Sequence, residues 1–571
     1  MLELRYKNVM RGYAMLDFAK DKKFWENVRT SNDYAQHRQE ILDLYKEAFK
    51  TEPRPHSAKE ILENNDGGLW RLQFDQMQTA SMLSLIYPDN EEYYDNLLKI
   101  VWAYLNEYSW APLGHFNSYY NRTPKDYDVG LIDIFASSAA LALAEVKNLF
   151  EDRFPQLLKD RISAELKRRT IDPFLTRTYF WEKHPNNWAA VCAGGVGGVL
   201  MYECPEIFLQ QRGRLDSVMQ VYLDSYKDDG VCVEGTGYWS FGFGFFVTYA
   251  LLEKELTNGK VDWFEVPKVK EIATFMQKMF LQRDVIVSFS DCAGVQNYSV
   301  WLPHALRTIY GEDVEKLPIK LAIMAKDNTH LNFLLRCILY FRPEYVTNEI
   351  EESASYHMKD SAYFVKRTPH YGFATKGGNN GESHNHNDVG SFIFARNNHQ
   401  ILCDLGAGPY KTGYHENARY TFFNPSAFSH NIPFFDGVGQ DGVRRDNVYL
   451  NVNENMSVVS MDFTNGYGQD YLKKAERTFT LDEDKIALCD KFTLTKESVI
   501  TERFVSVIEP RIVGNKVIIE DTTLECKEGL IPNISIHEAE THVGEVKFNA
   551  YLIDYVLPTG VCEFNLLINT K

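Results

Sequence analysis

The sequence predicts a multidomain α+β protein in which a helical toroid or bundle is followed by stacked antiparallel β-sheets. Apolar residues recur every three or four positions over the first 345 or so of the 571 residues, and beyond that point the period changes to two. The acidic run Glu349-Ile350-Glu351-Glu352 lies at the changeover. We therefore expect a helical domain over residues 1–345 and an antiparallel β-sheet domain over residues 355–571.

The first half of the chain contains helical segments separated by clusters of Pro, Gly and Asn. No repeat of fixed length is visible, so a solenoid of the TPR or HEAT type is not supported. The glycine-rich run at residues 193–198 lacks the Lys-Ser/Thr of a phosphate-binding loop, and we expect it to let two helices approach closely. The clearest helical segments are residues 92–105, 131–149, 156–169, 214–227 and 243–256.

The second half contains short segments that are mostly rich in β-branched and aromatic residues, several of them bounded by turn residues such as Asn397-Asn398. This pattern predicts stacked antiparallel sheets. The expected strands are residues 363–366, 390–395, 400–404, 448–452, 456–462, 499–508 and 517–520.

Composition excludes several classes of function. Lys and Arg number 61 and Asp and Glu 78, which gives a net charge of −17, and no basic run offsets this excess. Nucleic-acid and anionic-membrane partners are therefore disfavoured. The aromatic content of 14% suits a sugar-stacking cleft as well as an ordinary core.

The nine cysteines are scattered and form no CxxC pair, which argues against a disulfide framework and a zinc knuckle. The first residues do not resemble a secretory signal. The most apolar runs, residues 129–146 and 189–202, are short or interrupted by Asp133 and by glycines, so no membrane span is expected. These features favour a reducing cytoplasm.

The densest polar cluster covers residues 381–388, with the sequence Gly-Glu-Ser-His-Asn-His-Asn-Asp. In an extended strand His384, His386 and Asp388 would share one face. Asp404 ends a later apolar strand, and His430 follows in a Ser-His-Asn sequence. Two imidazoles and a carboxylate suit Zn²⁺ or Mn²⁺, so the pattern predicts a metal site, with simple hydrogen bonding at strand ends as the alternative.

Two further residues stand out in the helical half. Asn187 is at the start of a predicted helix, where a side chain either caps the helix or faces a cleft. Tyr238 lies in a loop with the sequence Glu-Gly-Thr-Gly-Tyr. Either residue taken alone is more typical of a structural role.

In combination, these motifs resemble the heparinase II/III-like polysaccharide lyases. The order and spacing of the motifs are specific, although each motif is short. The resemblance implies an incomplete (α/α) toroid followed by an antiparallel β-sandwich. The residues that carry it are Asn187-Trp188, Glu234-Gly235-x-x-Tyr238, His384-x-His386-x-Asp388-x-x-Ser391-Phe392, Asp404-x-Gly406 and Ser429-His430-Asn431.

The resemblance implies a carbon–oxygen lyase that cleaves an acidic, uronate-containing polysaccharide or oligosaccharide by β-elimination. A glycosaminoglycan such as heparan sulfate, chondroitin sulfate or hyaluronan is the expected substrate. Asn187 and His384 match the family positions that hold the uronate carboxylate, and Tyr238 matches the catalytic tyrosine. Tyr414 is the candidate for a second catalytic tyrosine, with Tyr420 close behind.

The family's metal ligands correspond to His386, Asp404 and His430, which implies one divalent ion, Zn or Mn, with a structural role. One departure is Trp188, because some relatives have a histidine beside the cleft asparagine. The excess of negative charge also fits poorly with a sulfated polyanion.

Three other functions compete with the lyase interpretation. A glycoside hydrolase would need two carboxylates across the scissile bond, and Asp228, Asp229 and Glu234 are available near Tyr238. A cupin-like metalloenzyme would place a glutamate a few residues after the second histidine, where this chain has Asp388. A non-catalytic carbohydrate-binding protein would keep the aromatic residues without needing the Asn, Tyr and His set.

Overall fold

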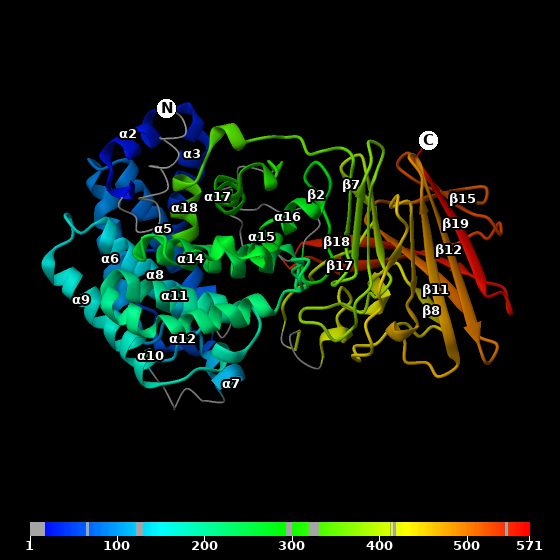
Figure 1. The fold of residues 1–571 in the computed structure, drawn as a ribbon, viewed down its shortest axis with the longest axis horizontal. Helices are drawn as coiled ribbons and strands as arrows, with labels where there is room; N and C mark the ends of the chain where they lie inside the picture. Colours follow the sequence, from blue (N-terminus) through cyan, green and yellow to red (C-terminus); the bar gives the residue numbers. More distant parts are fainter. Residues whose placement is uncertain are drawn as a thin grey trace.

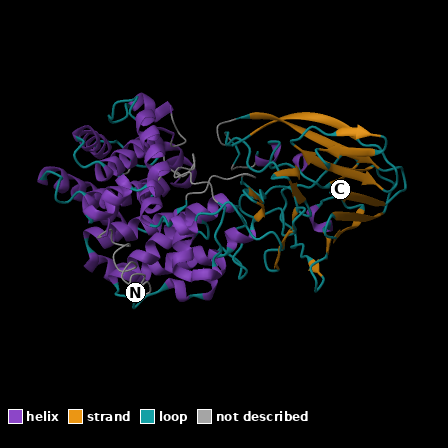
Figure 2. Cartoon of the chain, turned by 90° about the horizontal axis from the view of Figure 1, so that it is seen from above, coloured by secondary structure: helices purple, strands orange, loops and turns teal. Residues whose placement is uncertain are grey.

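The computed structural model describes residues 18–63, 68–120, 129–292, 300–318, 331–411, 413–414, 418–542 and 546–570. The molecule is elongated, with helices gathered at one end and sheets at the other (Figures 1 and 2). The change from helices to strands falls between the 3₁₀ turn η9 (Pro343–Tyr345) and strand β3 (Ala354–Met358). No helix among the described residues is both long and apolar enough to cross a bilayer.

The helical region is built around α11, which is buried along most of its length and packs against α8, α12 and α14. Its glycines permit this packing, because a Cβ atom on Gly195 would lie 2.6 Å from the Ser137 carbonyl oxygen on α8. The expected close approach of helices at this run is confirmed. The helices are α2 (Lys22–Thr30), α3 (Ala35–Ala48), α4 (Ala58–Glu63), α5 (Gly68–Ile86), α6 (Glu91–Leu105), α7 (Leu113–Tyr120), α8 (Ile134–Leu149), α9 (Gln156–Leu166), α10 (Asp172–Thr176), α11 (Asn187–Glu203), α12 (Pro205–Asp224), α13 (Thr236–Tyr238), α14 (Gly244–Leu256), α15 (Pro267–Ala273), α16 (Phe275–Lys278), α17 (Trp301–Tyr310) and α18 (Leu331–Leu339).

The strands form antiparallel sheets, in the orders β3-β4-β5-β6-β7, β17-β18-β13-β8 and β14-β15-β16-β19-β12-β11-β10-β9, together with a β1-β2 pair inside the helical region. Their bounds are β1 (Phe280–Gln282), β2 (Val285–Ile286), β3 (Ala354–Met358), β4 (Tyr363–Arg367), β5 (Gly372–Lys376), β6 (Phe392–Arg396), β7 (His399–Leu402), β8 (Pro433–Phe435), β9 (Asn451–Val452), β10 (Val458–Asp462), β11 (Leu472–Leu481), β12 (Lys485–Leu494), β13 (Ile500–Ser506), β14 (Arg511–Val513), β15 (Lys516–Ile519), β16 (Thr522–Cys526), β17 (Asn533–Glu540), β18 (Lys547–Val556) and β19 (Glu563–Asn569). The predicted order, helices and then antiparallel sheets, is confirmed.

The five-stranded sheet is the middle layer of the molecule. Along β6, Ile393 and Ala395 join the core of the helices, whereas Phe392 and Phe394 join the core between this sheet and the eight-stranded one. Successive side chains of a strand point to opposite faces, so a strand with apolar cover on both sides is apolar throughout. This explains why β5 and β6 show no alternation of polar and apolar residues.

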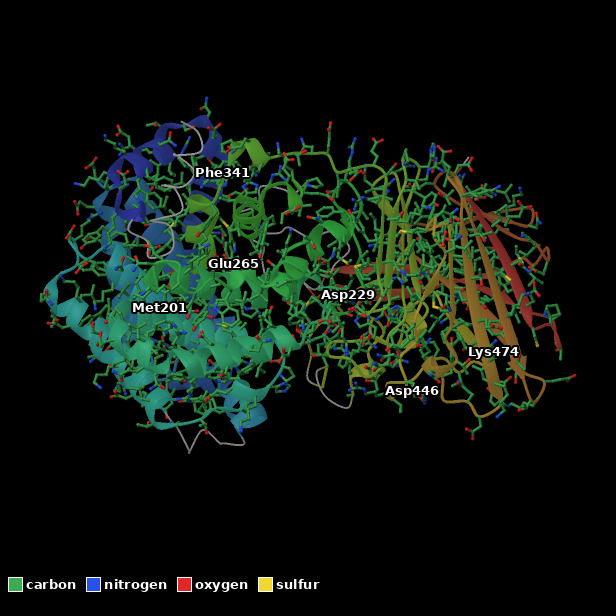
Figure 3. The ribbon with its side chains drawn as sticks, viewed as in Figure 1. Met201, Asp229, Glu265, Phe341, Asp446 and Lys474 are labelled. Atoms are coloured by element: carbon green, nitrogen blue, oxygen red, sulfur yellow. The ribbon has the colours of Figure 1, made fainter. Side chains whose placement is uncertain are left out.

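The junction between the two regions is also held by polar contacts. Asp229, after α12, is labelled at this junction in Figure 3. It accepts hydrogen bonds from the backbone and hydroxyl of Ser361, at 2.8 and 2.7 Å. The aspartate belongs to the helical region and the serine to the turn between β3 and β4. A cleft at this junction is therefore lined from both regions.

Candidate active site and metal centre

A cavity of about 330 Å³ opens at the junction of the helices and sheets. Its walls come from the start of α11, the end of α12, the loop before α13, and two loops of the β region. The lining residues are Pro185, Asn187, Tyr222, Asp224, Ser225, Tyr226, Lys227, Val231, Cys232, Val233, Glu234, Tyr238, Asn379, Gly381, Glu382, Ser383, Arg444 and Asn447.

Asn187 lines this cavity from the first turn of α11. The helix is capped by the preceding residue, Asn186, whose side chain accepts a hydrogen bond from the Trp188 backbone. Capping is therefore assigned to Asn186, and the Asn187 side chain faces the cleft with 8% of its surface exposed.

Tyr238 lies in the same cavity at the end of α13, beyond Gly235, whose φ of +108° requires glycine. The Tyr238 ring lies against the His384 ring, with 4.1 Å between centroids. The Tyr238 hydroxyl shares a hydrogen bond of 3.2 Å with the hydroxyl of Tyr410. Burial and the negative charge of Asp291 raise the pKa of Tyr238 well above 10, so its resting form is the phenol.

The segment from His384 to Asp388 is a turn, and the expectation of an extended strand here is wrong. His384 has a φ of +54°, in the left-handed region, and the strand itself begins only at Phe392. The three side chains consequently diverge instead of sharing a face. His384 stacks on Tyr238, His386 points into the buried interior, and Asp388 makes an ion pair of 2.8 Å with Lys376.

Asp291 connects the two histidines, and the sequence contained no motif that singled it out. Its carboxylate accepts hydrogen bonds from Nδ1 of His384 at 2.7 Å and from Nε2 of His386 at 3.2 Å. Arg419 and the Tyr414 hydroxyl also donate to it, at 2.8 and 3.0 Å. Burial would raise the pKa of Asp291, but the two histidines and the Arg419 charge outweigh it and hold the pKa well below its usual range.

The His384 pKa is raised for the complementary reason. Burial favours the neutral ring, but the hydrogen bond to Asp291 and the nearby Glu234 carboxylate favour the imidazolium more strongly. Since Nδ1 is bonded to Asp291, the orientation of the ring is defined.

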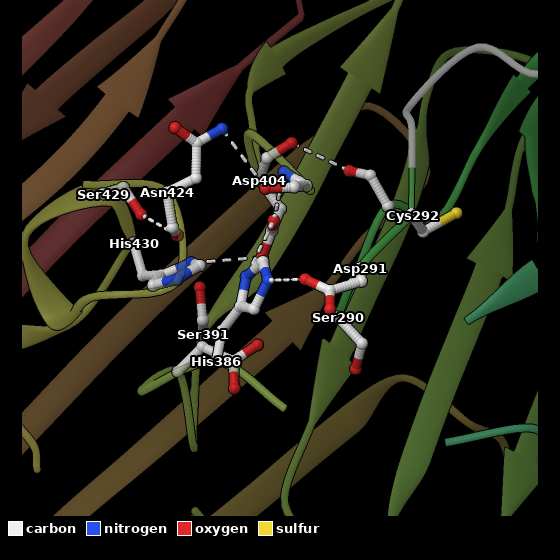
Figure 4. A network of polar contacts seen from close by, with 12 residues as sticks. Ser290, Asp291, Cys292, His386, Ser391, Asp404, Asn424, Ser429 and His430 are labelled. Carbon is white, nitrogen blue, oxygen red and sulfur yellow. Dashed lines mark hydrogen bonds and ion pairs between the residues drawn. The ribbon is translucent and has the colours of Figure 1, made fainter. Parts of the chain in front are cut away.

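The structure brings His386, Asp404 and His430 together in one buried cluster (Figure 4). One ligand atom from each residue lies within 4.8 Å of the other two. Nδ1 of His386 and Nε2 of His430 are buried with no hydrogen-bond partner, and Nδ1 of His430 lies 3.1 Å from the Asp404 carboxylate. Such orphaned polar atoms are costly unless something binds them, and two imidazoles with a carboxylate fit a divalent metal.

The outer contacts of this cluster also fit a metal centre. The bond from His386 Nε2 to Asp291 leaves Nδ1 directed at the Asp404 carboxylate, 4.0 Å away. A carboxylate behind a ligating histidine is the usual second partner of such a ligand. Two of the three ligand-bearing segments are further tied by Arg477, whose guanidinium donates to the carbonyls of Gly390 and Asn431 at 2.8 and 2.7 Å.

The structure separates the roles of the candidate tyrosines. Tyr414 is buried, and its hydroxyl donates to Asp291 and accepts from the Gly408 backbone. It therefore helps to position the Asp291 carboxylate. Tyr420 donates to the backbone carbonyls of Asn380 and Asn385, on either side of His384, at 3.2 and 3.5 Å. The tyrosine that contacts Tyr238 is Tyr410, which sequence reasoning missed because nothing in its local sequence distinguishes it from Tyr414.

Of the three acids considered for a hydrolase, only one lines the cavity. Glu234 lies in the wall beside Tyr238. Asp229 is engaged by Ser361, and the exposed Asp228 lies 3.9 Å from the Lys268 ammonium. These acids therefore do not form a facing pair in the cleft.

Comparison with known proteins agrees with this organisation. Residues 351–516 match the family described as Heparinase II/III-like, C-terminal. A search of curated proteins finds no match. The resemblance carried by the sequence motifs is thereby confirmed for this part of the chain.

Solved structures of polysaccharide lyases share the fold of the whole chain. Heparinase III aligns with a TM-score of 0.61 at 13% identity, over 87% of this chain and 76% of its own. A heparan sulfate lyase mutant from Pedobacter heparinus aligns with 0.61 at 12% identity, over 98% and 92%. The Streptomyces coelicolor chondroitin AC lyase, in complex with chondroitin sulphate, aligns with 0.57 at 9% identity, over 96% and 82%. The fold is thus a helical toroid followed by an antiparallel β-sandwich.

Proposed function

We propose, from the match of residues 351–516 to the heparinase II/III-like family and from the lyase fold of the whole chain, that this protein cleaves uronate-containing polysaccharides or oligosaccharides by β-elimination. The observation that carries the proposal is the contact of His384 with Tyr238, which lines a cavity together with Asn187.

Elimination imposes three tasks on a site. The proton at C5 is only weakly acidic, so the neighbouring carboxylate must be neutralised, the proton must be removed, and the departing 4-oxygen must be protonated. The carboxylate is neutralised by preorganised hydrogen-bond donors, which stabilise the charge that develops on it. Positioned proton donors and acceptors supply the other two.

In the proposed mechanism Asn187 and His384 bind the uronate carboxylate. The raised pKa of His384 favours the imidazolium, and its bond to Asp291 holds the ring beside Tyr238, where it would donate to the substrate carboxylate. The Asn187 amide adds a neutral donor from the first turn of α11 in the cavity wall. Both donors stabilise the enolate-like intermediate, which carries more charge on the carboxylate than the substrate does.

Tyr238 handles the proton in this scheme. Its oxygen would accept the C5 proton while its own phenol proton passes to the departing 4-oxygen, so that the phenol is regenerated at the end of the step. The hydrogen bond to Tyr410 and the adjacent His384 ring would stabilise the negative charge that develops on the Tyr238 oxygen during the transfer. The pair Tyr238 and Tyr410 therefore replaces the pair Tyr238 and Tyr414 expected from the sequence.

The divalent ion, Zn or Mn, belongs to the proposal as a structural element. His386, Asp404 and His430 would hold it, and its charge would bind together the three segments that carry these ligands. The proton and carboxylate chemistry is assigned to groups on the other side of Asp291.

The test is absorbance in the ultraviolet during incubation with heparan sulfate, chondroitin sulfate, hyaluronan and alginate, because elimination creates a conjugated double bond. Rising absorbance with falling polymer length supports the lyase. New reducing ends without absorbance would identify a hydrolase, and binding without cleavage would identify a carbohydrate-binding protein. The variant Tyr238→Phe should abolish the signal while binding persists.

A further inference from the structure

The segment that carries Tyr410 lies outside any helix or strand. It belongs to the connection between β7 and β8, and residues 403–411 have no regular secondary structure. The proposed function nevertheless needs the Tyr410 hydroxyl within hydrogen-bond reach of Tyr238, whose hydroxyl is 3.2 Å away. The orientation of the Tyr410 ring therefore depends on contacts with other segments of the chain.

His542, two residues beyond the end of β17, contacts this segment through its ring and its backbone. Its ring stacks on the Tyr410 ring, with 3.6 Å between centroids and 29° between planes. Its backbone N–H donates to the Ala407 carbonyl at 3.3 Å. The Tyr414 ring also lies against Tyr410, with 4.8 Å between centroids. Because stacked rings cannot tilt independently, the His542 ring limits the orientations that are open to Tyr410.

Further contacts attach the β17–β18 hairpin to the same connection. The Glu540 carboxylate accepts a hydrogen bond from the Lys411 ammonium at 2.8 Å. The His537 ring stacks on the Phe423 ring, with 3.7 Å between centroids. These contacts fix where the hairpin lies on the connection, and so they fix the place from which His542 meets Tyr410.

We propose that His542 is a positioning residue for the elimination, because its ring holds the Tyr410 hydroxyl in line with the Tyr238 oxygen. This inference rests on the proposed function. It adds a residue from beyond the part of the chain that matches the family, since residues 351–516 end before β17 begins at Asn533. A displacement of about 1 Å in such a group can lower a reaction rate by about 10²-fold.

The first experiment separates the ring of His542 from its polarity. His542→Gln keeps a polar side chain without a ring, and we expect kcat to fall by at least about tenfold with a much smaller change in KM. His542→Phe keeps a ring that can stack, and it should retain most of the wild-type kcat. His370→Gln is the matched control, because it makes the same change on the exposed loop between β4 and β5.

The kinetic constants are read by ultraviolet absorbance on the polymer that the wild type eliminates fastest. A wild-type kcat in His542→Gln, or an equal loss in His542→Phe, would overturn the role of His542 and leave the lyase function intact. Elimination of no uronate polymer by the wild type would overturn the proposed function, and this inference with it.

The second experiment asks whether His542 acts through the Tyr410 hydroxyl. Tyr410→Phe removes that hydroxyl and keeps the ring, so adding His542→Gln to it should lower kcat little further. Losses that multiply in the double variant would show that His542 acts independently of the hydroxyl, and would overturn the proposal.

The variant His537→Ala tests whether docking of the hairpin alone explains the effect. It removes a similar stack on the same connection, but on Phe423, so kcat should fall less than in His542→Gln. An equal loss would assign the effect to the hairpin as a whole and would overturn the specific role of His542. Circular dichroism and melting temperature verify that every variant is folded.

Discussion

The two histidines of the His-x-His sequence occupy opposite environments although one residue separates them. The His384 side chain is 20% exposed and stacks on Tyr238, whereas the His386 side chain is completely buried beside Asp404 and His430. Both rings bond to the same carboxylate, Asp291. A partly exposed pair, His384 and Tyr238, and a buried cluster around His386 thus share Asp291 as a hydrogen-bond partner. The proposed function assigns the reaction to the first and a structural role to the second.

The backbone explains how neighbouring residues reach such different sites. The left-handed conformation of His384 turns the chain, so that its side chain contacts Tyr238 whereas that of His386 is buried beside Asp404 and His430. If the two clusters have separate functions, substitutions should affect one without the other, except at the shared carboxylate.

The largest difference between the effect on activity and the effect on metal binding is expected for Tyr238→Phe. This change removes the only ionisable atom of the ring and keeps its packing on His384, so kcat should fall by about 10²–10⁴-fold. Metal content and melting temperature should remain at wild-type values. The exposed Tyr108→Phe serves as the control. A variant that retains more than about a tenth of the wild-type kcat would contradict the role of Tyr238.

The variant His384→Asn should affect activity alone. Asparagine tolerates the positive φ at this position, so the turn is preserved. Loss of one preorganised donor should lower kcat by about 10²–10³-fold. Elemental analysis should still find the metal, whereas His386→Asn should lose it. Metal loss in His384→Asn would show that the two clusters are not independent.

Asp291→Asn should damage both clusters. The amide is a weaker acceptor for His386, and loss of such an outer partner typically lowers metal affinity by about 10–100-fold. The His384 imidazolium would lose its counter-charge, so turnover should fall as well. Chelator competition and ultraviolet assays measure the two effects. A change in only metal affinity or only turnover would contradict the shared role of Asp291.

Metal removal should produce the smallest effect. Binding at a concentration 100 times the Kd stabilises a folded protein by about 2.7 kcal/mol, so dialysis against a chelator should lower the melting temperature by a few degrees. Zn²⁺ or Mn²⁺ should restore it. Tyr238→Phe should show the same shift, and His386→Asn should show none. An unchanged melting temperature in the wild type would argue against a structural metal.

Helices with a strong apolar period were predictable to within a residue or so. Residues 92–105 and 243–256 correspond to α6 (Glu91–Leu105) and α14 (Gly244–Leu256), because local periodicity and flanking turn residues define such segments. The strand expected at 390–395 starts only at Phe392, since Gly390 has a φ of +84° and belongs to the turn. The β1-β2 pair was not foreseen, because it depends on packing between regions.

In the candidate site, too, some residues could be predicted from the sequence and others could not. His386, Asp404 and His430 could be named because their motifs recur in order along the chain, and Asn187 and Tyr238 could be named in the same way. Asp291 and Tyr410 could not be named. Each matters only through a partner far away in sequence, 93 residues for Asp291 and His384, and 172 for Tyr410 and Tyr238.

By itself the sequence determined which segments are helical or extended and which residue types were available for chemistry, since periodicity, turn residues and motif order are local properties. The tertiary structure alone decided which histidine contacts Tyr238 and which is fully buried, and which tyrosine shares a hydrogen bond with Tyr238. It also decided that Arg477 ties Gly390 to Asn431. The physical reason is that hydrogen bonds and burial act through space, and folding brings together groups whose separation along the chain carries no signal.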